Sequence, residues 1–585
     1  MLPDHLELRL IRNSKDVSDF FDWLGRPRRL LGADTETTGF SPERDRVRLI
    51  QFGDRDMGWA MAWEDWRGVA KEVFEQYEGD YTWHNSKFDI RHLCNDLGVK
   101  TESWPWHRTH DGMGMAHIAD SQRPKGLKPL GDRIVDRRIS GAQKALDEGM
   151  KRNGWGWHDV PIDFDPYWQY GALDPVISVY ITEHFIDDTP KELYDIEMGS
   201  TRVAAKMEEL GMRISRSYSQ NKYDELTSYA QRARDWLYAE YGISKPTPMQ
   251  LVKFFNEHNV PLIDKHTGGG AQSMDKHVLA TTDHDVARTV LNIRKAEKRA
   301  GYLENFLELS GEDGIIHPTI NTMAARTGRM SITDPALQTL PRGDAIVREA
   351  FIPREGHSLL TIDADQIEAR LTAHFSGDEG LIQAFLGDDD FFCTIASTIY
   401  GREIIKGMME RDLTKGVVYG KVYGASVMKM AETAEVAPIE MMKTNALFDS
   451  NFPRVHQFMN EVIHEGKNRA RQAPDKRGYV TTPYGRKLKS DENREYTLVN
   501  YLIQCHASEI LKKKLVMLDA ALPKEALIVL PVHDEIIFDV PTEMVGEIKQ
   551  TAEEVLNESS EYKVPLTWGA DILHESWGEK YRKKG

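Results

Sequence analysis

The chain has 585 residues and is acidic, with 92 Asp and Glu against 75 Lys and Arg and a net charge of −17. This length gives room for about three or four domains that each bury a core. The three cysteines lie far apart without metal-ligand spacing, which excludes a disulfide framework and indicates a reducing environment. The N-terminus lacks a signal-peptide pattern, and no apolar run approaches the roughly 18 residues of a membrane span. We therefore predict a cytoplasmic protein without membrane contact.

Net acidity does not exclude nucleic-acid binding, because binding depends on local basic patches and because metal-site carboxylates add acid to the total. Taken alone, each basic cluster is typical of a solvated helix face. The clusters are Arg294, Lys295, Lys298 and Arg299; then Lys467, Arg469, Arg471, Lys476 and Arg477; then Lys512–Lys514.

Acidic residues recur in the first 195 residues at ends of predicted elements. Residues 30–39 form an apolar strand that becomes polar, and alternation places Asp34 and Glu36 on one face of it. Asp89 follows at the start of a helix. Tyr170 and Asp174 lie one turn apart on a later helix.

Four acids and a tyrosine in this order resemble the DEDD-type 3′–5′ exonucleases in their tyrosine variant. The resemblance implies that the four acids hold two metal ions and that Tyr170 orients the attacking water. Asp111 also matches a family position, but its context favours a helix cap or a substrate contact. The alternative is a set of surface acids and a core tyrosine. The four implied ligands are Asp34, Glu36, Asp89 and Asp174.

Residues 196–310 have a helical pattern, with a long amphipathic stretch over Leu226–Tyr241. A polar segment follows at Thr327–Ser331. Residues 358–375 then give a short buried strand, Leu359–Ile362, which delivers Asp363 at its end before the apolar period changes to that of a helix. A strand-end Asp is most often a helix cap, so this position alone does not establish catalysis.

The helix predicted over residues 411–424 carries two cations and two aromatic residues at steps of four. They line one broad face that drifts by about 40° per step, which suits a triphosphate and a stacked base. The alternative is a basic amphipathic helix with core tyrosines. Gly416 and Gly420 weaken this helix by roughly 1 kcal/mol each relative to Ala, which suits an element that bends. The residues of the face are Arg411, Lys415, Tyr419 and Tyr423.

Two apolar runs, 526–532 and 536–540, predict a hairpin with acidic residues at its apex. Like charges on a tight buried turn are unfavourable unless a cation neutralises them. Asp363 and Asp534 would supply bridging ligands for two ions roughly 3.5–4 Å apart, which clamp the oxygens of a phosphoryl transfer.

These segments resemble motifs A (363–370), B (411–424) and C (532–535) of the family A, DNA polymerase I-like, DNA polymerases. The resemblance implies an α/β multidomain fold: a ribonuclease H-like exonuclease domain, then a right-hand polymerase with an antiparallel palm sheet and helical thumb and fingers. The expected bounds are 1–195 for the exonuclease, 196–310 for the thumb, 311–375 and 491–585 for the palm, and 376–490 for the fingers.

The resemblance also assigns site residues. Asp363, Asp534 and the Ile362 carbonyl would bind metal, with Glu535 and His533 supporting the primer end. The incoming nucleotide would meet Arg411, Lys415, Tyr419 and Gln366, with Lys415 also stabilising or protonating the leaving group. Glu368 would be the gate against a ribose 2′-hydroxyl, and Tyr423 would shape the template site. The DNA contacts would be Arg329, Gln338, Asn500 and Gln504 in the minor groove and Arg294 and Lys298 on phosphates.

The implied cofactors are two Mg²⁺ ions in each active site, for which Mn²⁺ can substitute. The implied partners are primer-template DNA and deoxynucleoside triphosphates, with a helicase, primase or single-strand-binding protein as further candidates and a monomeric enzyme as the expected state.

Three features depart from the bacterial pattern: Tyr419 stands where Phe is usual, Asp365 replaces a small polar residue, and Phe391–Cys393 replaces a segment that normally holds His. Together with the missing 5′-nuclease region, Tyr419 favours a phage replicative enzyme in the host cytoplasm. The predicted thumb, residues 196–310, is too short to contain a large insertion. A bacterial repair polymerase, a single-subunit RNA polymerase, a nuclease with a degenerate polymerase half and a non-catalytic DNA-binding scaffold are the alternatives. Glu368 and the exonuclease pattern argue against the RNA polymerase.

Overall fold

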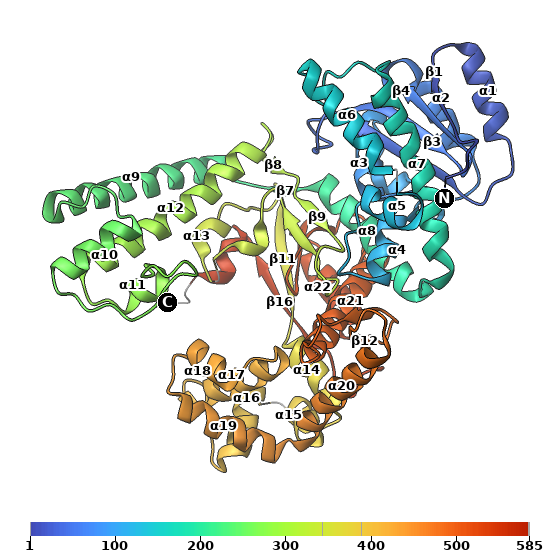
Figure 1. The fold of residues 1–585 in the computed structure, drawn as a ribbon. Coiled ribbons are helices and arrows are strands. Elements are labelled where there is room, and N and C mark those ends of the chain that lie inside the picture. The colour runs from blue at the N-terminus through green and yellow to red at the C-terminus, as the bar shows by residue number, and fades with distance from the viewer. Residues whose placement is uncertain (1, 138, 342, 388, 583–585) are drawn as a thin grey trace.

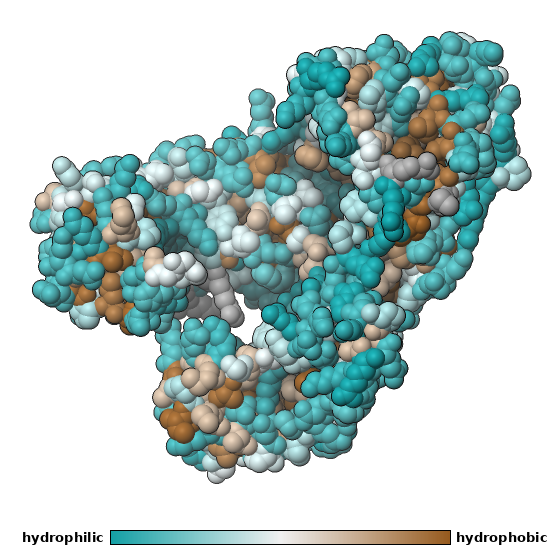
Figure 2. Space-filling model, in the orientation of Figure 1, coloured by the Kyte–Doolittle hydropathy of each residue, from teal (hydrophilic) through white to brown (hydrophobic). Residues whose placement is uncertain are grey.

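The computed structural model describes residues 2–137, 139–341, 343–387 and 389–582. Figure 1 shows an N-terminal sheet domain at upper right, a small central sheet, a pair of long helices at left and a cluster of helices below. The space-filling view in Figure 2 shows the molecule hollowed between the left and lower lobes. In the described ranges, no helix combines the length and apolar character that crossing a membrane requires.

The N-terminal domain is built on a six-stranded sheet of order β1-β4-β3-β2-β5-β6. β3 runs antiparallel to both neighbours, and the other pairings are parallel, which is a ribonuclease H-like topology. The strands are β1 (Glu7–Ile11), β2 (Leu31–Thr37), β3 (Val47–Gly53), β4 (Met57–Ala62), β5 (Tyr81–Trp83) and β6 (Thr109–Asp111). The helices are α1 (Ser14–Leu24), α2 (Trp63–Gln76), α3 (Ser86–Leu97), α4 (Gly112–Ala119), α5 (Leu127–Ile134), α6 (Ile139–Asn153) and α7 (Asp165–Phe185).

Helix α7 packs directly on β1–β4, and two strand glycines allow its backbone to approach. A Cβ on Gly32 would lie 2.1 Å from the carbonyl oxygen of Pro175, and one on Gly58 would lie 1.9 Å from that of Ala172. Both distances are shorter than any real contact, so these positions require glycine. This close packing holds the middle of α7 against the acidic end of β2.

The thumb is an antiparallel pair of long helices, α9 (Arg216–Tyr241) and α12 (Asp285–Leu309), capped by α10 (Pro248–Glu257) and α11 (Lys276–Thr281). Apolar residues at helical spacing, among them Leu237, Val290 and Ile293, fill the space between the two helices. The connecting helix α8 (Lys191–Leu210) runs without a break across the expected 195/196 boundary and packs on α21.

The palm is an antiparallel sheet of order β14-β15-β11-β16. Its strands are β11 (His357–Ala364), β14 (Leu527–Val532), β15 (Glu535–Pro541) and β16 (Trp568–Leu573). The palm helices are α13 (Ala345–Arg348), α14 (Ile367–Ser376), α21 (Thr497–Ala521) and α22 (Val545–Asn557), and η5 (Trp577–Tyr581) is a 3₁₀ turn. Four short strands lie between thumb and palm: β7 (Met212–Arg213), β8 (Ile315–Ile316), β9 (Thr319–Asn321) and β10 (Ser331–Thr333).

The fingers have a core of their own, in which Phe391, Phe392 and Phe448 are buried. Their helices are α15 (Glu379–Leu386), α16 (Phe391–Tyr400), α17 (Met409–Val422), α18 (Val427–Ala434), α19 (Pro438–Asn451) and α20 (Pro453–Gln472). The hairpin of β12 (Tyr479–Thr481) and β13 (Lys487–Lys489) follows. Helix α20 packs on α14 and α21, and therefore ties the fingers to the palm.

The strands expected at 30–39, 359–362, 526–532 and 536–540 and the helices expected at 226–241 and 411–424 are all present. The fold class predicted from the sequence is confirmed: a ribonuclease H-like domain followed by a right hand of palm, fingers and thumb.

Two candidate active sites

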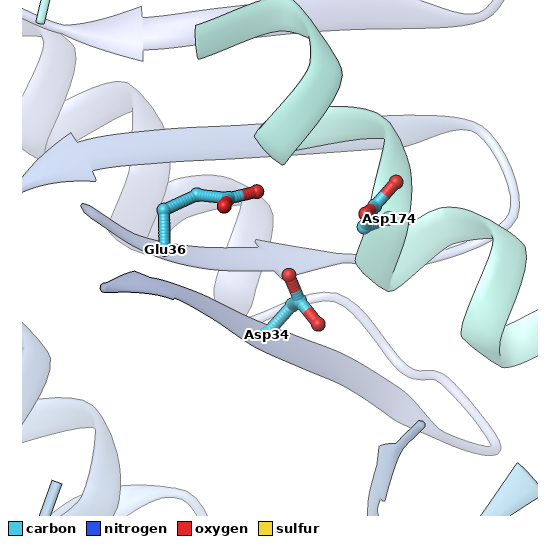
Figure 3. Close-up of side chains that lie close together, drawn as sticks. All are labelled: Asp34, Glu36 and Asp174. Atoms are coloured by element: carbon cyan, nitrogen blue, oxygen red, sulfur yellow. The ribbon is translucent and has the colours of Figure 1, made fainter. Parts of the chain in front are cut away.

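The first site lies where β2 meets α7. Asp34 and Glu36 are alternate residues of β2 and point to the same side, and Asp174 faces them from α7 (Figure 3). One carboxylate oxygen from each of the three lies within 4.8 Å of the others. Among the described residues, this is the only group of three or more potential ligands that is so close. It is the spacing that a bound cation needs.

Asp89 and Asp111 border this site in different roles. Asp89, on α3, is buried beside Asp34 and accepts hydrogen bonds from the Thr35 backbone N–H at 3.0 Å and its hydroxyl at 2.7 Å. Asp111 is the N-cap of α4 and accepts from the N–H groups of Met113 and Gly114. The cap interpretation of Asp111 is confirmed, because both its oxygens are engaged by backbone donors at this cap and at the start of α3.

Lys128 also belongs to this site, and the sequence analysis missed it. Its ammonium group, from the first turn of α5, donates to Asp174 Oδ1 and lies 3.8 Å from the centre of the Tyr170 ring. The side chain is 7 % exposed. In the sequence, the one indication of this role is that Lys128 lies within the otherwise apolar run Leu127–Leu130, where a side chain is expected to be buried. Lysines are rarely fully buried unless they are paired, so a lysine at this position predicts an acidic partner.

Burial controls the protonation of this site. It raises the pKa of Asp34, which Glu36 raises further, and it raises the pKa of Asp89, with Asp34 adding to the effect. It also raises the pKa of Glu36 to about 8 although Lys128 opposes the shift. The pKa of the Tyr170 hydroxyl is raised by burial and by Glu36. A buried set of carboxylates with raised pKa values fits hard divalent cations, which bind oxygen ligands and release the protons.

The second site lies at the end of the palm sheet. β14 and β15 are joined by a two-residue turn, His533 and Asp534, with His533 in the left-handed region at φ 56°. The Asp534 carbonyl accepts from the Ala364 N–H at 3.1 Å, which fixes the turn beside the end of β11. Register pairs Asp363 with Glu535. Ile362 is fully buried in the ladder between Ile536 and Ala570.

Lys580 enters this acidic group from η5, and the sequence analysis missed it as well. Its ammonium group lies 2.7 Å from a Glu535 oxygen, 3.8 Å from Asp363 and 3.9 Å from Asp571. Burial raises the pKa of Asp363, Asp534 and Glu535, and Lys580 moderates the shift for Asp363 and Glu535. The Asp363 side chain is 51 % exposed, so this site is far more open than the first.

Glu368 is held at the centre of a polar cluster. It is buried on α14 and accepts from Arg329 and from the hydroxyl of Tyr423, the C-cap residue of α17. Arg329 thus faces the palm acids while part of its side chain stays exposed, and it opposes the rise that burial causes in the pKa of Asp534. Gln366 is the left-handed N-cap residue of α14, and its buried Oε1 has no hydrogen-bond partner among the described residues.

The predicted face of the fingers helix α17 reaches the palm through Tyr423, and its first cation is already paired. Arg411 makes two hydrogen bonds to Asp390, at 3.1 and 3.0 Å. Lys415 lies 5.7 Å from the Phe392 ring, and Tyr419 packs between the rings of Phe392 and Tyr423. Phe392, part of the segment that departs from the bacterial pattern, therefore packs against Lys415 and Tyr419 of the predicted face.

The remaining residues predicted to contact DNA differ in whether their side chains are exposed or already hydrogen-bonded within the protein. Asn500 and Gln504 lie one turn apart on α21, both partly exposed, and Lys298 is exposed on α12. Gln338 donates to the Met330 carbonyl at 3.0 Å. Arg294 donates to the Met274 carbonyl at 2.6 Å and so braces the thumb.

A ribonuclease H-like domain with a buried acid cluster, joined to a right hand with paired carboxylates at the palm, defines a polymerase architecture with a nuclease-type domain. The sequence profile of DNA polymerase family A matches residues 213–579, and the chain belongs to this family.

Relatives of the whole chain include the DNA polymerase of Mycobacterium phage D29, 27% identical over 607 aligned residues and covering 99% of this chain and 98% of the relative. DNA polymerase I of Aquifex aeolicus is 25% identical, with 94% and 95% coverage. A solved structure, the POL domain of Pol1 from M. smegmatis in complex with DNA primer-template and dNTP, has the same fold, with a TM-score of 0.80, 22% identity and coverage of 98% and 99%.

Proposed function

We propose that this chain is a template-directed DNA polymerase that adds deoxynucleotides to a primer 3′ end and removes mismatched ends with its N-terminal 3′–5′ exonuclease. The observation that carries the proposal is the juxtaposition of Asp363 and Asp534 at the palm hairpin, inside the family A match. We assign residues 1–195 to the exonuclease, 196–310 to the thumb, 311–375 and 491–585 to the palm, and 376–490 to the fingers.

The palm carboxylates fit a pair of divalent cations, because they are close, partly desolvated and of raised pKa. Asp363, Asp534 and the Ile362 carbonyl would hold Mg²⁺ or Mn²⁺, which supplies charge that activates a hydroxyl and neutralises a leaving oxygen. Arg411 and Lys415 would bind the triphosphate, with Lys415 donating to the leaving pyrophosphate. Arg411 must first exchange Asp390 for phosphate.

Glu368 would select the sugar. Its buried carboxylate is fixed from two sides, by Arg329 and by Tyr423, so that it cannot swing away from an incoming ribose. A 2′-hydroxyl would meet this group, while deoxyribose would not. The templating base would pack near Tyr423, and the duplex would contact Gln504, Asn500, Gln338 and Arg329 in its minor groove and Lys298 and Arg294 on its phosphates.

The exonuclease proposal depends on the acid cluster at β2 and α7. Asp34, Glu36 and Asp174, with Asp89 beside them, would hold two divalent cations, and Tyr170 would orient the attacking water. A second, independent support is domain context: a nuclease-type fold lies next to a primer-extending site, which is the arrangement that proofreading needs.

We further propose that the enzyme acts as a monomer in replication of a phage genome in the cytoplasm of the host, with primer-template DNA and deoxynucleoside triphosphates as substrates. Two phage DNA polymerases, from phages D29 and L5, align along nearly the whole chain, which supports this role. A helicase, primase or single-strand-binding protein would be its partner at a fork. The second candidate is repair synthesis in a bacterium, since DNA polymerase I of Aquifex aeolicus aligns almost as fully.

The test is primer extension from a mismatched 3′ end with Mg²⁺ and four deoxynucleotides, comparing wild type with Asp34→Ala. We expect wild type to trim the mismatch and extend, and the variant to stall or to extend the mismatch. Failure of both proteins to extend even a matched primer would overturn the polymerase proposal.

A further inference from the structure

Lys128 has a position that neither the fold nor the polymerase reaction explains. It follows Gly126 and Leu127 in the first turn of α5, a helix that packs on α6 and α7. Its side chain points into the acid cluster, with its ammonium on Asp174 and above the Tyr170 ring. Burial of an ammonium group is costly unless charged partners surround it, so the cluster and this lysine stabilise one another.

The net charge of the site indicates a role for Lys128. Asp34, Glu36, Asp89 and Asp174 contribute four negative charges when ionised; Glu36, Asp89 and Asp174 are buried, and Asp34 is partly buried. Two divalent cations would neutralise the four acids without help. Lys128 then leaves one positive charge in excess, and one phosphodiester of a DNA strand carries the single negative charge that balances it.

The backbone around Lys128 is fixed, but its side chain can move. The preceding segment is anchored to the polymerase half: the Lys125 ammonium donates to the Met323 carbonyl, and the Gln122 amide donates to the Lys489 carbonyl. A lysine has four rotatable side-chain bonds, so its ammonium can leave Asp174 without a backbone change.

We propose that Lys128 is a resident counter-cation of the exonuclease site, which competes with divalent metal for Asp174 and transfers to a phosphate of the bound strand. The inference rests on the proposed exonuclease function. Its consequence is that metal binds weakly while the site is empty of DNA and more tightly once a strand takes the ammonium group, so that loading with metal is coupled to substrate.

Mn²⁺ binding to the full-length protein, followed by electron paramagnetic resonance, tests this without reference to activity. Mn²⁺ bound at the proposed exonuclease site is defined as the part of the total Mn²⁺ binding that Asp34→Ala removes. We expect K128M to bind Mn²⁺ at this site at least about tenfold more tightly than wild type when DNA is absent, because a competing buried charge is gone. K128R, which keeps the charge, should resemble wild type.

The matched control is K125M, a lysine three residues away that contacts a backbone carbonyl and not the acids; its Mn²⁺ affinity should not change. Adding oligothymidylate with a phosphorothioate 3′ linkage should tighten Mn²⁺ binding in wild type and K128R by a larger factor than in K128M. Thermal melts with and without Mn²⁺ identify misfolding: K128M should be less stable than wild type without metal and should recover the difference with it.

Equal or weaker Mn²⁺ binding by K128M, with a cooperative melt, would overturn the inference and leave the proposed exonuclease intact. If K128M does not fold, the test depends on K128R. Added DNA must increase the Mn²⁺ affinity of K128R by the same factor as in wild type, and loss of this increase would overturn the inference. Absence of any Asp34-dependent Mn²⁺ binding in wild type would remove the exonuclease proposal, and the competition with it.

Discussion

The two acidic sites of this enzyme are built in opposite ways. The proposed exonuclease site lies inside one domain, where a strand and a helix that pack through glycine hold three carboxylates within 4.8 Å. The polymerase site combines acids of the palm with residues assigned to substrate on the fingers, and its Asp363 is half exposed. The first site is thus nearly complete before substrate arrives, whereas the second has to be completed by it.

Ion pairs occur in both sites, but they differ in number. In the proposed exonuclease site Lys128 pairs with Asp174, as Lys580 pairs with Glu535 in the polymerase site. In the polymerase site, two arginines assigned to substrate are paired with carboxylates as well: Arg411 with Asp390, and Arg329 with Glu368. If Arg411 binds the triphosphate as proposed, nucleotide binding would exchange Asp390 for phosphate at this arginine.

The largest effect we predict separates the two sites completely. Asp534→Asn should lower the polymerisation rate by about a thousandfold or more and leave hydrolysis of single strands unchanged, because a lost metal ligand removes several kcal/mol of transition-state stabilisation. Asp34→Asn should do the reverse. Single-turnover extension and degradation assays on one preparation check both; a variant that loses both activities would show that the sites are not independent.

A backbone change should damage the preassembled site alone. Gly32→Ala places a Cβ 2.1 Å from the Pro175 carbonyl oxygen, so α7 must shift, at a cost of roughly 1–3 kcal/mol. We expect a lower melting temperature and weaker exonuclease activity with normal primer extension. The matched control is Gly68→Ala, since Gly68 is exposed in α2 and nothing lies within 4 Å of its added Cβ. Equal behaviour of the two variants would contradict the packing argument.

The open site should respond to a single hydroxyl. Tyr419 lies between Phe392 and Tyr423 on the side of α17 that we assign to the nucleotide. We expect wild type to accept dideoxynucleotides readily, because the Tyr419 hydroxyl would make the hydrogen bond that a missing 3′-hydroxyl cannot. Tyr419→Phe should discriminate against dideoxynucleotides about tenfold more, which is the effect of losing one hydrogen bond. Competitive incorporation ratios measure this. A strong preference of wild type for deoxynucleotides would contradict this role of Tyr419.

The smallest predicted effect is a pH dependence of stability that the closed site causes. The pKa of Glu36 is raised by burial to about 8, so the metal-free folded protein binds a proton that the unfolded chain releases above about pH 4.5. Stability without metal should therefore fall as pH rises from about 5 to 8. Because metal binding displaces that proton, Mn²⁺ should raise the melting temperature more at pH 8 than at pH 6. Asp34→Ala with Glu36→Gln should abolish the difference; an equal Mn²⁺ effect at both pH values would contradict it.

Much of the polymerase half could be predicted because its signals are local. The strand before Asp363, the hairpin around Asp534 and the four-residue spacing along α17 are each visible within about fifteen residues of sequence, and the structure has each of them. Local periodicity suffices there because a strand with one buried face and a helix with one functional face leave a repeat in the sequence.

The sites themselves depended on long-range contacts that no local pattern contains. Lys128 reaches Asp174 across 46 positions, and Lys580 reaches Asp363 from the last turn of the described chain. Asp390 takes Arg411 as its partner, and Arg294, predicted on phosphate, also donates to the Met274 carbonyl within the thumb. A lone lysine or arginine in the sequence has many possible partners, and only the packing of distant segments selects one.

The sequence by itself therefore determined the family resemblance, the elements and the acids, since carboxylates at strand ends and helix faces follow from short-range periodicity. Only the tertiary structure decided which cations lie on those acids, which site is closed and which is open. The physical reason is that burial and charge pairing are properties of segments brought together from far apart, and these two quantities control how readily each site takes metal and substrate.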